Sequence, residues 1–344
     1  MRRRVLSAAL SALAATMACP SLGSAGEPFT DPADAGPDYA AQGEYAGHIL
    51  LKGRKTPYAA QVIALGNGRF QAVFYAGGLP GAGWDGSARV AVDGRREKDG
   101  VAFEPAKGPK EYLAGGETFS ALEANPPEGQ RAYAAAVAGN KLAGRTDKGD
   151  AFVLDRTVRK SPTLGAPPPP GAIVLLPYKA GAPPPLDGWT NRKWKAMPDG
   201  SMMVTPQSGN TTSVEAFGGS KFHLHLEFTS PFMPGARGQG RGNSGVFPPP
   251  GREVQVLDSF GLQGLPNECG GLYKDVPPKV NMCLPPLTWQ TYDILFRNNA
   301  YQIHHNGVLI HEKIEAGGAK KGLELQDHND PVRYRNIWVN PDMK

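Results

Sequence analysis

Residues 241–258 alternate hydrophobic and polar side chains in a pattern that predicts two paired strands. Successive side chains of an extended strand point to opposite faces, so Glu253 and Gln255 share one face and the valines beside them share the other. Residues 248–251, Pro-Pro-Pro-Gly, form a turn sequence, which indicates that the two halves pair as a hairpin. We therefore expect a half-buried strand that carries a carboxylate and a carboxamide on a usable face.

Two further polar residues belong to this hairpin. By parity Asn243 shares its face with Phe247 and stands beside Glu253 or Gln255. Asp258 falls at the end of the second strand, where a turn begins. An ordinary amphipathic strand with a solvated outer face has the same pattern, so the hairpin alone does not establish a site.

The remainder of residues 171–344 shows further strand-length runs and predicts an all-β domain. Asn306-Gly307 is a hairpin turn signal within it. Antiparallel strands in this number predict a two-sheet sandwich of the jelly-roll type. The runs are residues 172–176, 201–205, 221–229, 291–297, 301–305, 308–312, 322–326 and 332–340.

Residues 39–160 predict a separate, small antiparallel β domain. They contain several strand-length runs, and Asn67-Gly68 is a strong hairpin signal. They have no dense cluster of His, Asp or Glu, so we expect docking or substrate framing rather than catalysis. Residues 161–170 form a Pro-rich linker to the next domain, and residues 26–38 read as a flexible leader.

Composition supports the all-β reading. The chain has 344 residues with 44 glycines and 33 prolines, and 40% of its residues are hydrophobic, which suits two domains of short strands joined by turns. The formal net charge is +5, and loss of an Arg-rich N-terminal segment would lower it to +2. A charge this small and scattered argues against a nucleic-acid partner.

Residues 1–25 predict an export signal. Three arginines, Arg2 to Arg4, precede an apolar run over residues 5–18, and Gly23-Ser24-Ala25 is a small-residue cleavage site. We expect a periplasmic or extracellular protein without a transmembrane span, since the apolar run is short for a bilayer. A lipid-modified Cys19 is a minor alternative, because the residues before it match that signal poorly.

Cys269 and Cys283 would remain as a pair after removal of the signal. In an oxidising compartment an even pair predicts a disulfide. Catalytic thiol chemistry or a cysteine metal site would require partners or a spacing that the chain lacks.

Two other strands add polar groups that we expect beside Glu253. In residues 222–228 the phenylalanines and leucines face a core, which leaves His223, His225 and Glu227 on the opposite face. In residues 323–328 the outward residues are Glu324 and Gln326, with Asp327 and His328 at the strand exit. A divalent metal is possible here, although the spacing is not a known metal signature and a solvated face is the alternative. The candidate ligands are His225, Glu227, Glu253, Asp258 and His328.

Motifs in order along residues 171–340 carry a resemblance to a known family. They include Arg-Gly-Asn-Ser-Gly-Val at 241–246, Glu-Val-Gln-Val-Leu-Asp-Ser at 253–259, Glu-Cys-Gly-Gly-Leu-Tyr at 268–273 and Leu-Gln-Asp-His at 325–328. Together they resemble the 3-keto-disaccharide hydrolase domain family, long a domain of unknown function. The resemblance implies a concanavalin-A-like lectin/glucanase sandwich. Residues 39–160 lie outside it.

The implied activity is cleavage of glycosides already oxidised to a ketone at sugar C3. The ketone acidifies the hydrogen on C2, so a base can remove it, the group on C1 can leave, and water can add. Such a site needs a base, a stabiliser for the enolate and an acid for the leaving oxygen. The hypothesis assigns His328 or Glu253 as base, Asp258 as orienting or protonating group, Asn243, Gln255, Gln326 and Tyr273 to substrate binding, and Arg333 or a divalent ion to the enolate charge.

Two alternatives stay open for the same small carbohydrate substrate. Direct hydrolysis by two carboxylates could use Glu253 with Glu227. A lectin-like sandwich could also bind sugars without cleaving them, with Tyr273, Trp289 and Trp338 stacking on sugar faces.

Overall fold

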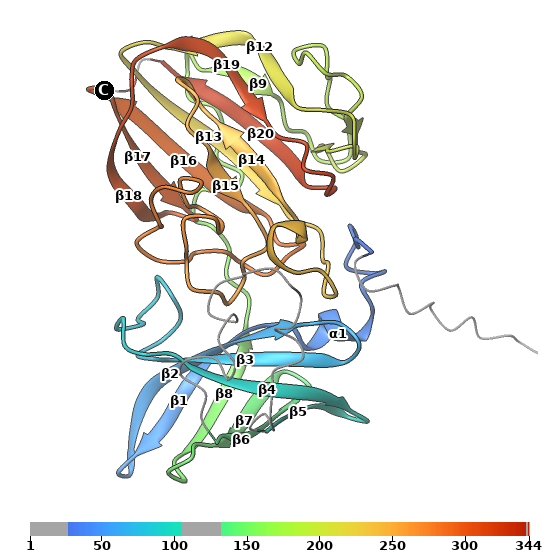
Figure 1. Cartoon of the computed structure of the whole chain (residues 1–344), viewed down its shortest axis with the longest axis vertical. Coiled ribbons are helices and arrows are strands. Elements are labelled where there is room, and N and C mark those ends of the chain that lie inside the picture. Colours follow the sequence, from blue (N-terminus) through green and yellow to red (C-terminus); the bar gives the residue numbers. More distant parts are fainter. Residues whose placement is uncertain (1–26, 105–131, 342, 344) are drawn as a thin grey trace, which may run out of the picture.

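The computed structural model describes residues 27–104, 132–341 and 343, and β-strands dominate these residues. The described part has one α-helix, α1 (Gly36–Ala41), and a short 3-10 turn, η3 (Gly238–Gly240). The all-β class is confirmed. Figure 1 shows a blue-to-green barrel at one end of the molecule and yellow-to-red sheets at the other. No helix among the described residues is long and apolar enough to cross a membrane. The predicted export signal and Cys19 lie outside them.

The N-terminal strands close into an eight-stranded antiparallel barrel, where the sequence indicated only a small β domain. Sequential strands pair with one another, and β1 also pairs with β8. Asn67 (φ 54°) and Gly68 (φ 67°) form the predicted turn between β2 and β3, since both adopt the positive φ that such turns require. The strands are β1 (Gly43–Leu51), β2 (Arg54–Ala64), β3 (Arg69–Ala76), β4 (Val90–Glu97), β5 (Gly100–Glu104), β6 (Ala134–Ala138), β7 (Lys141–Arg145) and β8 (Ala151–Thr157).

The C-terminal strands form two sheets. The large sheet has the order β10 (Lys195–Ala196), β11 (Met202–Met203), β20 (Arg333–Asn340), β13 (Lys221–Thr229), β16 (Gln290–Arg297), β17 (Ala300–His305) and β18 (Val308–Glu315), and β9 (Ile173–Leu176) also pairs with β20. The small sheet has the order β12 (Thr211–Gly218), β19 (Lys320–Leu325), β14 (Ser244–Phe247) and β15 (Val254–Val256).

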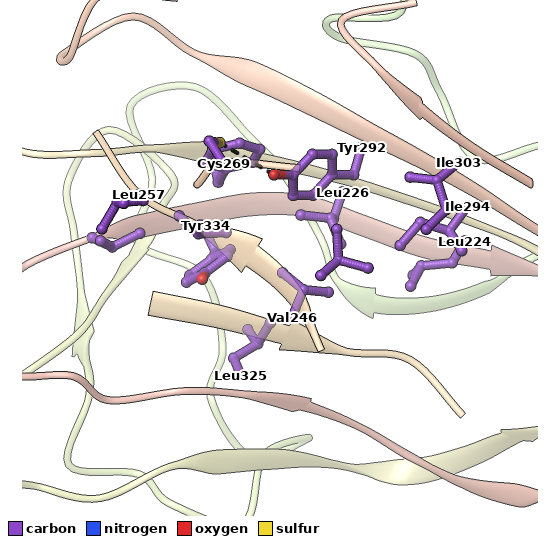
Figure 2. Packing of buried hydrophobic residues seen from close by; sticks show 14 of the residues in the cluster. Leu224, Leu226, Val246, Leu257, Cys269, Tyr292, Ile294, Ile303, Leu325 and Tyr334 are labelled. Atoms are coloured by element: carbon purple, nitrogen blue, oxygen red, sulfur yellow. Dashed lines mark hydrogen bonds between the residues drawn. The ribbon is translucent and has the colours of Figure 1, made fainter. Parts of the chain in front are cut away.

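One hydrophobic core lies between these two sheets. Leu224 and Leu226 of the large sheet belong to the same buried cluster as Val246, Val254 and Val256 of the small sheet. Figure 2 shows Val246 beside Leu325, with Leu224 and Leu226 on the other side of this core. Alternation along each strand therefore places every second side chain in the core and the others on an outer face, and the two outer faces lie on opposite sides of the core.

The barrel packs against this C-terminal unit. Ile63, Leu65 and Tyr75 of the barrel belong to the cluster that contains the core of the two sheets. Phe29 of the predicted leader exchanges backbone hydrogen bonds of 3.0 and 2.9 Å with Phe232. The two halves of the chain therefore share buried surface.

The predicted disulfide is absent from the structure, in which Cys269 and Cys283 are free and buried. The Cys269 thiol lies 3.2 Å from the Tyr292 hydroxyl, and the Cys283 thiol donates to the carbonyl of Leu257 at 3.5 Å. Burial raises the pKa of Cys283 well above its ordinary value, and the neighbouring Cys269 raises it further. The two thiols also form a hydrogen bond with each other, so the pair lies side by side in the core as free thiols.

Candidate active site

The hairpin predicted from residues 241–258 exists and forms the centre of the candidate site. Gly245 of β14 lies opposite Gln255 of β15, and the valines on either side face the core. The Glu253 carboxyl occupies the outer face directly over Gly245. A Cβ atom on Gly245 would lie 2.4 Å from Glu253 Oε1. The absence of a side chain at Gly245 therefore provides the space that the Glu253 carboxyl occupies.

Glu253 is partly buried and has an unusual acidity. Burial is the largest influence, the negative charge of Glu324 adds to it, and Lys274 opposes both; together they raise the pKa of Glu253 to about 7. A carboxyl that titrates near neutrality can accept and return a proton under physiological conditions. Perturbed acidities of this kind are concentrated at functional sites.

Three amide side chains form a connected cluster next to Glu253. Gln255 Nε2 donates to Gln239 Oε1 at 2.9 Å, and Asn243 Nδ2 donates to the Gln239 carbonyl at 2.8 Å and to its Oε1 at 3.2 Å. Asn243 Oδ1 is buried without a partner. Gln255 supports its neighbours rather than binding an outside ligand, because its Nε2 also lies 3.4 Å from Asn267 O and its Oε1 accepts the Val256 N–H at 3.1 Å. Sequence analysis missed Gln239, which lies in the η3 turn and follows no strand alternation.

β19 extends the same face on the other side of β14. Glu324 lies opposite Phe247, and the Gln326 backbone N–H donates to Gly245 O at 2.9 Å. His328 follows the strand and is exposed. β19 therefore places Gln326 beside Gly245, over which the Glu253 carboxyl lies, and His328 follows two residues later.

Asp330 fastens the His328 loop to the hairpin. Its Oδ2 accepts the backbone N–H of Asn243 at 2.7 Å. Burial raises the pKa of Asp330 to about 6, against the opposing effects of that hydrogen bond and of His328. Sequence analysis gave Asp330 no role.

Tyr273 and Lys274 border Glu253 from a neighbouring loop. The Tyr273 backbone N–H donates to Glu253 O at 3.2 Å, and Lys274 Nζ lies 5.1 Å from the centre of the Tyr273 ring. Lys274 has a positive φ of 59°, a left-handed conformation that is uncommon for residues other than glycine. The Lys274 ammonium therefore lies close enough to act on the Glu253 carboxyl, and the Tyr273 ring lies beside that ammonium.

Asp258 lies elsewhere than predicted. It is 2% exposed, and its Oδ2 accepts a hydrogen bond from Arg241 Nε at 2.8 Å. Burial raises the pKa of Asp258 despite this ion pair. Its burial and its ion pair with Arg241 argue against the predicted role of Asp258 as a protonating group for substrate.

His225 and Glu227 do not join the Glu253 face. They belong to β13 of the large sheet, so their outer face and that of Glu253 lie on opposite sides of the shared core. The Pro-rich linker covers them: Gly165 N–H donates to Glu227 Oε1 at 2.6 Å, and Thr163 Oγ1 donates to Asp293 Oδ2 at 2.7 Å. The predicted pairing of Glu227 with Glu253 as two hydrolytic carboxylates is therefore wrong.

The His225 and Glu227 side chains do not fit a metal either. His225 Nδ1 lies 2.8 Å from Asp293 Oδ1, and Glu227 accepts hydrogen bonds from Arg335 Nε at 2.7 Å and Asn336 Nδ2 at 2.9 Å. Burial works against charge on Glu227, yet these partners lower its pKa to about 2. Within the described ranges no group of three His, Cys, Asp or Glu side chains could hold a metal ion.

Arg333 and the two tryptophans also lie away from Glu253. Arg333 Nη1 pairs with Asp199 at 3.0 Å. Trp338 stacks on His225 at 5.0 Å between ring centres, and Trp289 lies 4.0 Å below the Arg335 guanidinium. These aromatic rings belong to the cluster on the large sheet, which leaves Tyr273 as the predicted stacking residue near Glu253.

Residues 184–340 match the profile of a family described as "3-keto-alpha-glucoside-1,2-lyase-like domain". The match contains β14, β15 and β19, and it confirms the resemblance found in the sequence. It does not include the barrel. A search of curated proteins gave no match to this chain.

Three of the solved structures similar to the chain each cover about half of it. One, named "putative glycosyl hydrolase" from Parabacteroides distasonis, is 25% identical with a TM-score of 0.42 and covers 50% of this chain and 84% of its own. A second structure so named from that organism is 17% identical, with a TM-score of 0.35 and coverage of 46% and 89%. Carbohydrate-binding module CBM66 from Bacillus subtilis is 15% identical, with a TM-score of 0.30 and coverage of 47% and 98%.

Proposed function

We propose that the outer face of the small sheet cleaves 3-keto-glycosides by elimination, with Glu253 as the base. The observation that carries the proposal is the Glu253 carboxyl, held over Gly245 with a pKa raised to about 7. It lies inside the segment that matches the 3-keto-glucoside lyase-like family. The family description suggests the substrate class. The raised pKa of Glu253 suits a group that removes and returns a proton near neutral pH.

The reaction requires removal of one proton and loss of one alcohol. Glu253 takes the proton from C2, and the electrons of that C–H bond form an enolate with the C3 ketone. The enolate then returns its electrons to form a C1–C2 double bond, and the C1–O bond breaks. The leaving oxygen takes up a proton, which Glu253, now protonated, can provide. Addition of water to the double bond would complete a net hydrolysis.

Lys274 is better placed than Arg333 to offset the enolate charge. Lys274 acts on Glu253 electrostatically, whereas Arg333 is paired with Asp199 away from Glu253. His328 remains the second candidate for proton transfer, because it is exposed and follows β19, the strand next to the hairpin. Stabilisation of developing negative charge by a positioned cation is a common source of rate enhancement.

The test compares a 3-keto-disaccharide with the parent disaccharide, each with and without a chelator. The proposal expects cleavage of the keto form alone, with an unsaturated keto sugar as an early product. Cleavage of the parent sugar would instead support direct hydrolysis. Binding of either sugar without cleavage would support a carbohydrate-binding module.

We also propose that the protein is exported, on the basis of the signal-like residues 1–25. N-terminal sequencing of protein from the native cell should give a start near Gly26. Recovery of cytosolic protein with an intact Met1 would contradict export.

A further inference from the structure

The loop of residues 231–242 joins the barrel to the Glu253 face. It leads from β13 into β14, and its Phe232 pairs with Phe29 of the N-terminal leader. Gly235 lies against Gly66 in the turn between β2 and β3, where a Cβ atom on Gly66 would be 3.2 Å from Gly235 Cα. The loop therefore touches the barrel before it enters the candidate site.

Two arginines of this loop bind consecutive carbonyl groups of the barrel. Arg237 Nη2 donates to Leu65 O at 2.8 Å, and its Nη1 donates to two carbonyls of its own loop. Arg241 Nη2 donates to Ala64 O at 3.3 Å, while its Nε pairs with the buried Asp258. Burial, with the neighbouring Arg241, lowers the pKa of Arg237 to about 10, so Arg237 stays charged at neutral pH.

Gln239 follows Arg237 by two residues and directs the amides of the site. Its Nε2 donates to Asn267 O at 2.9 Å, which turns its Oε1 toward the amide groups of Gln255 and Asn243. Asn243 Nδ2 consequently donates to Gln239, which leaves Oδ1 as the free acceptor of the Asn243 side chain. That buried Oδ1 has no partner, and a buried acceptor without a donor is costly.

The acceptor character of Asn243 Oδ1 restricts what it can recognise. A sugar hydroxyl or a water molecule can donate to it, whereas a ketone oxygen cannot. Gln255 offers no spare donor either, since the two N–H groups of its Nε2 are directed to Gln239 Oε1 at 2.9 Å and Asn267 O at 3.4 Å. The ketone and the enolate must therefore find their donor elsewhere, for instance at Lys274.

We propose that the barrel is a positioning element for substrate recognition. Arg237 fixes the η3 turn to the barrel, and Gln239 in that turn holds Asn243 so that its Oδ1 accepts a sugar hydroxyl next to the reacting ketone. This inference rests on the proposed function. It assigns a role to the barrel, which lies outside the family match. Gln239 and Arg237 are positioning residues, because neither needs to touch the reacting atoms.

The first test compares Arg237→Gln with Arg89→Gln. Arg89 Nη1 donates to Leu262 O at 2.7 Å, so both changes remove an arginine-to-carbonyl hydrogen bond between barrel and sheets, but only Arg237 lies in the Gln239 loop. Arg237→Gln should raise KM about tenfold, as expected for one misplaced hydrogen bond, with a smaller effect on kcat. Arg89→Gln should leave KM near the wild-type value. Equal effects of the two changes on KM would overturn the proposal.

A second pair of variants tests Gln239 itself. Gln239→Met removes both the acceptor for Asn243 and Gln255 and the donor to Asn267 O, whereas Gln239→Glu restores the acceptor alone. KM should rise for Gln239→Met and recover in large part for Gln239→Glu. A deoxy substrate without the recognised hydroxyl should show little further loss with Gln239→Met. An equal KM for both variants would contradict the positioning role.

One readout separates this proposal from the proposed function. If the wild-type protein cleaves no 3-keto-glycoside, the proposed function fails, yet hydrogen exchange can still follow Ser244–Phe247. Arg237→Gln should speed exchange in this strand, and Arg89→Gln should not. Unchanged exchange in both variants would overturn the positioning role whatever the substrate.

Discussion

Glu253 is the base in the proposed reaction, and its acidity also has consequences for stability. A carboxyl whose pKa is raised in the folded state, here to about 7 from 4.5, penalises folding once it must ionise. The penalty is absent below about pH 4.5, grows as pH rises to about 7, and stays constant above that.

Glu253→Gln should therefore stabilise the protein at pH 8. We expect about 1 kcal/mol rather than the full value of the shift, because solvent screens part of the cost at a partly buried carboxyl. The gain should vanish at pH 4. Urea denaturation of both proteins at the two pH values provides the measurement, and an equal gain at both would contradict the raised pKa.

The neighbours of Glu253 should tune the pH dependence of activity. As a base, Glu253 must be deprotonated, so kcat/KM should rise with pH around a midpoint near 7. Glu324→Gln should lower this midpoint by removing a like charge, and Lys274→Gln should raise it by removing an opposite one. Lys313→Gln is a matched control on β18, where Lys313 pairs with Glu315. Shifts in the same direction for Glu324→Gln and Lys274→Gln would contradict the electrostatic account.

The face of a strand on which each side chain lies could be predicted from the sequence, but the hydrogen bonds and ion pairs of buried side chains could not. Alternation correctly placed Glu253 and Gln255 on one face and the valines on the other. It could not show that Asp258 turns inward to Arg241, because that ion pair depends on contacts outside the strand. Gln239 was missed for the same reason.

At the scale of elements, the Pro-rich linker is a docked segment rather than a simple spacer. It covers the outer face of β13 through hydrogen bonds to Glu227 and Asp293. Composition predicted its extended form, but pairing between distant strands decides which face it covers. The sequence placed the β13 face beside Glu253 because parity assigns a residue to a face of its own strand and does not say which sheet the strand joins.

Glu227→Gln should destabilise this docked linker. The folded-state pKa of Glu227 is about 2, against 4.5 ordinarily, so its ionised form contributes stability above about pH 4.5 that is lost as pH falls through about 2. We expect a loss of about 3 kcal/mol at pH 7, since Arg335 would also lose its buried partner. Thermal unfolding at pH 7 and pH 3 measures this, with Glu315→Gln on exposed β18 as the control. A loss that grows at the lower pH would contradict the account.

At the scale of the whole molecule, the barrel and the two sheets should unfold together. The barrel contributes Ile63 to the core shared by the sheets, where its Cδ1 would lie 2.5 Å from a Cβ atom on Gly261. The sequence divided the chain at the linker, because a Pro-rich stretch shows where strands stop and carries no information on packing across the boundary.

Ile63→Ala should lower stability by about 2 to 5 kcal/mol through the cavity that it leaves. Calorimetry should show one transition in the wild type and one transition, at lower temperature, in the variant. A second transition that keeps the wild-type midpoint would show that the two parts are independent, contrary to the shared core.

The most direct test of the central claim is the rate of 3-keto-glycoside cleavage by the wild type and by Glu253→Gln. The substitution keeps the shape over Gly245 and removes the base, so turnover should fall by at least about a hundredfold, in line with the usual contribution of a positioned acid or base. The variant should remain folded and should still bind the keto sugar. Wild-type turnover in Glu253→Gln would contradict the claim that the Glu253 face is the active site.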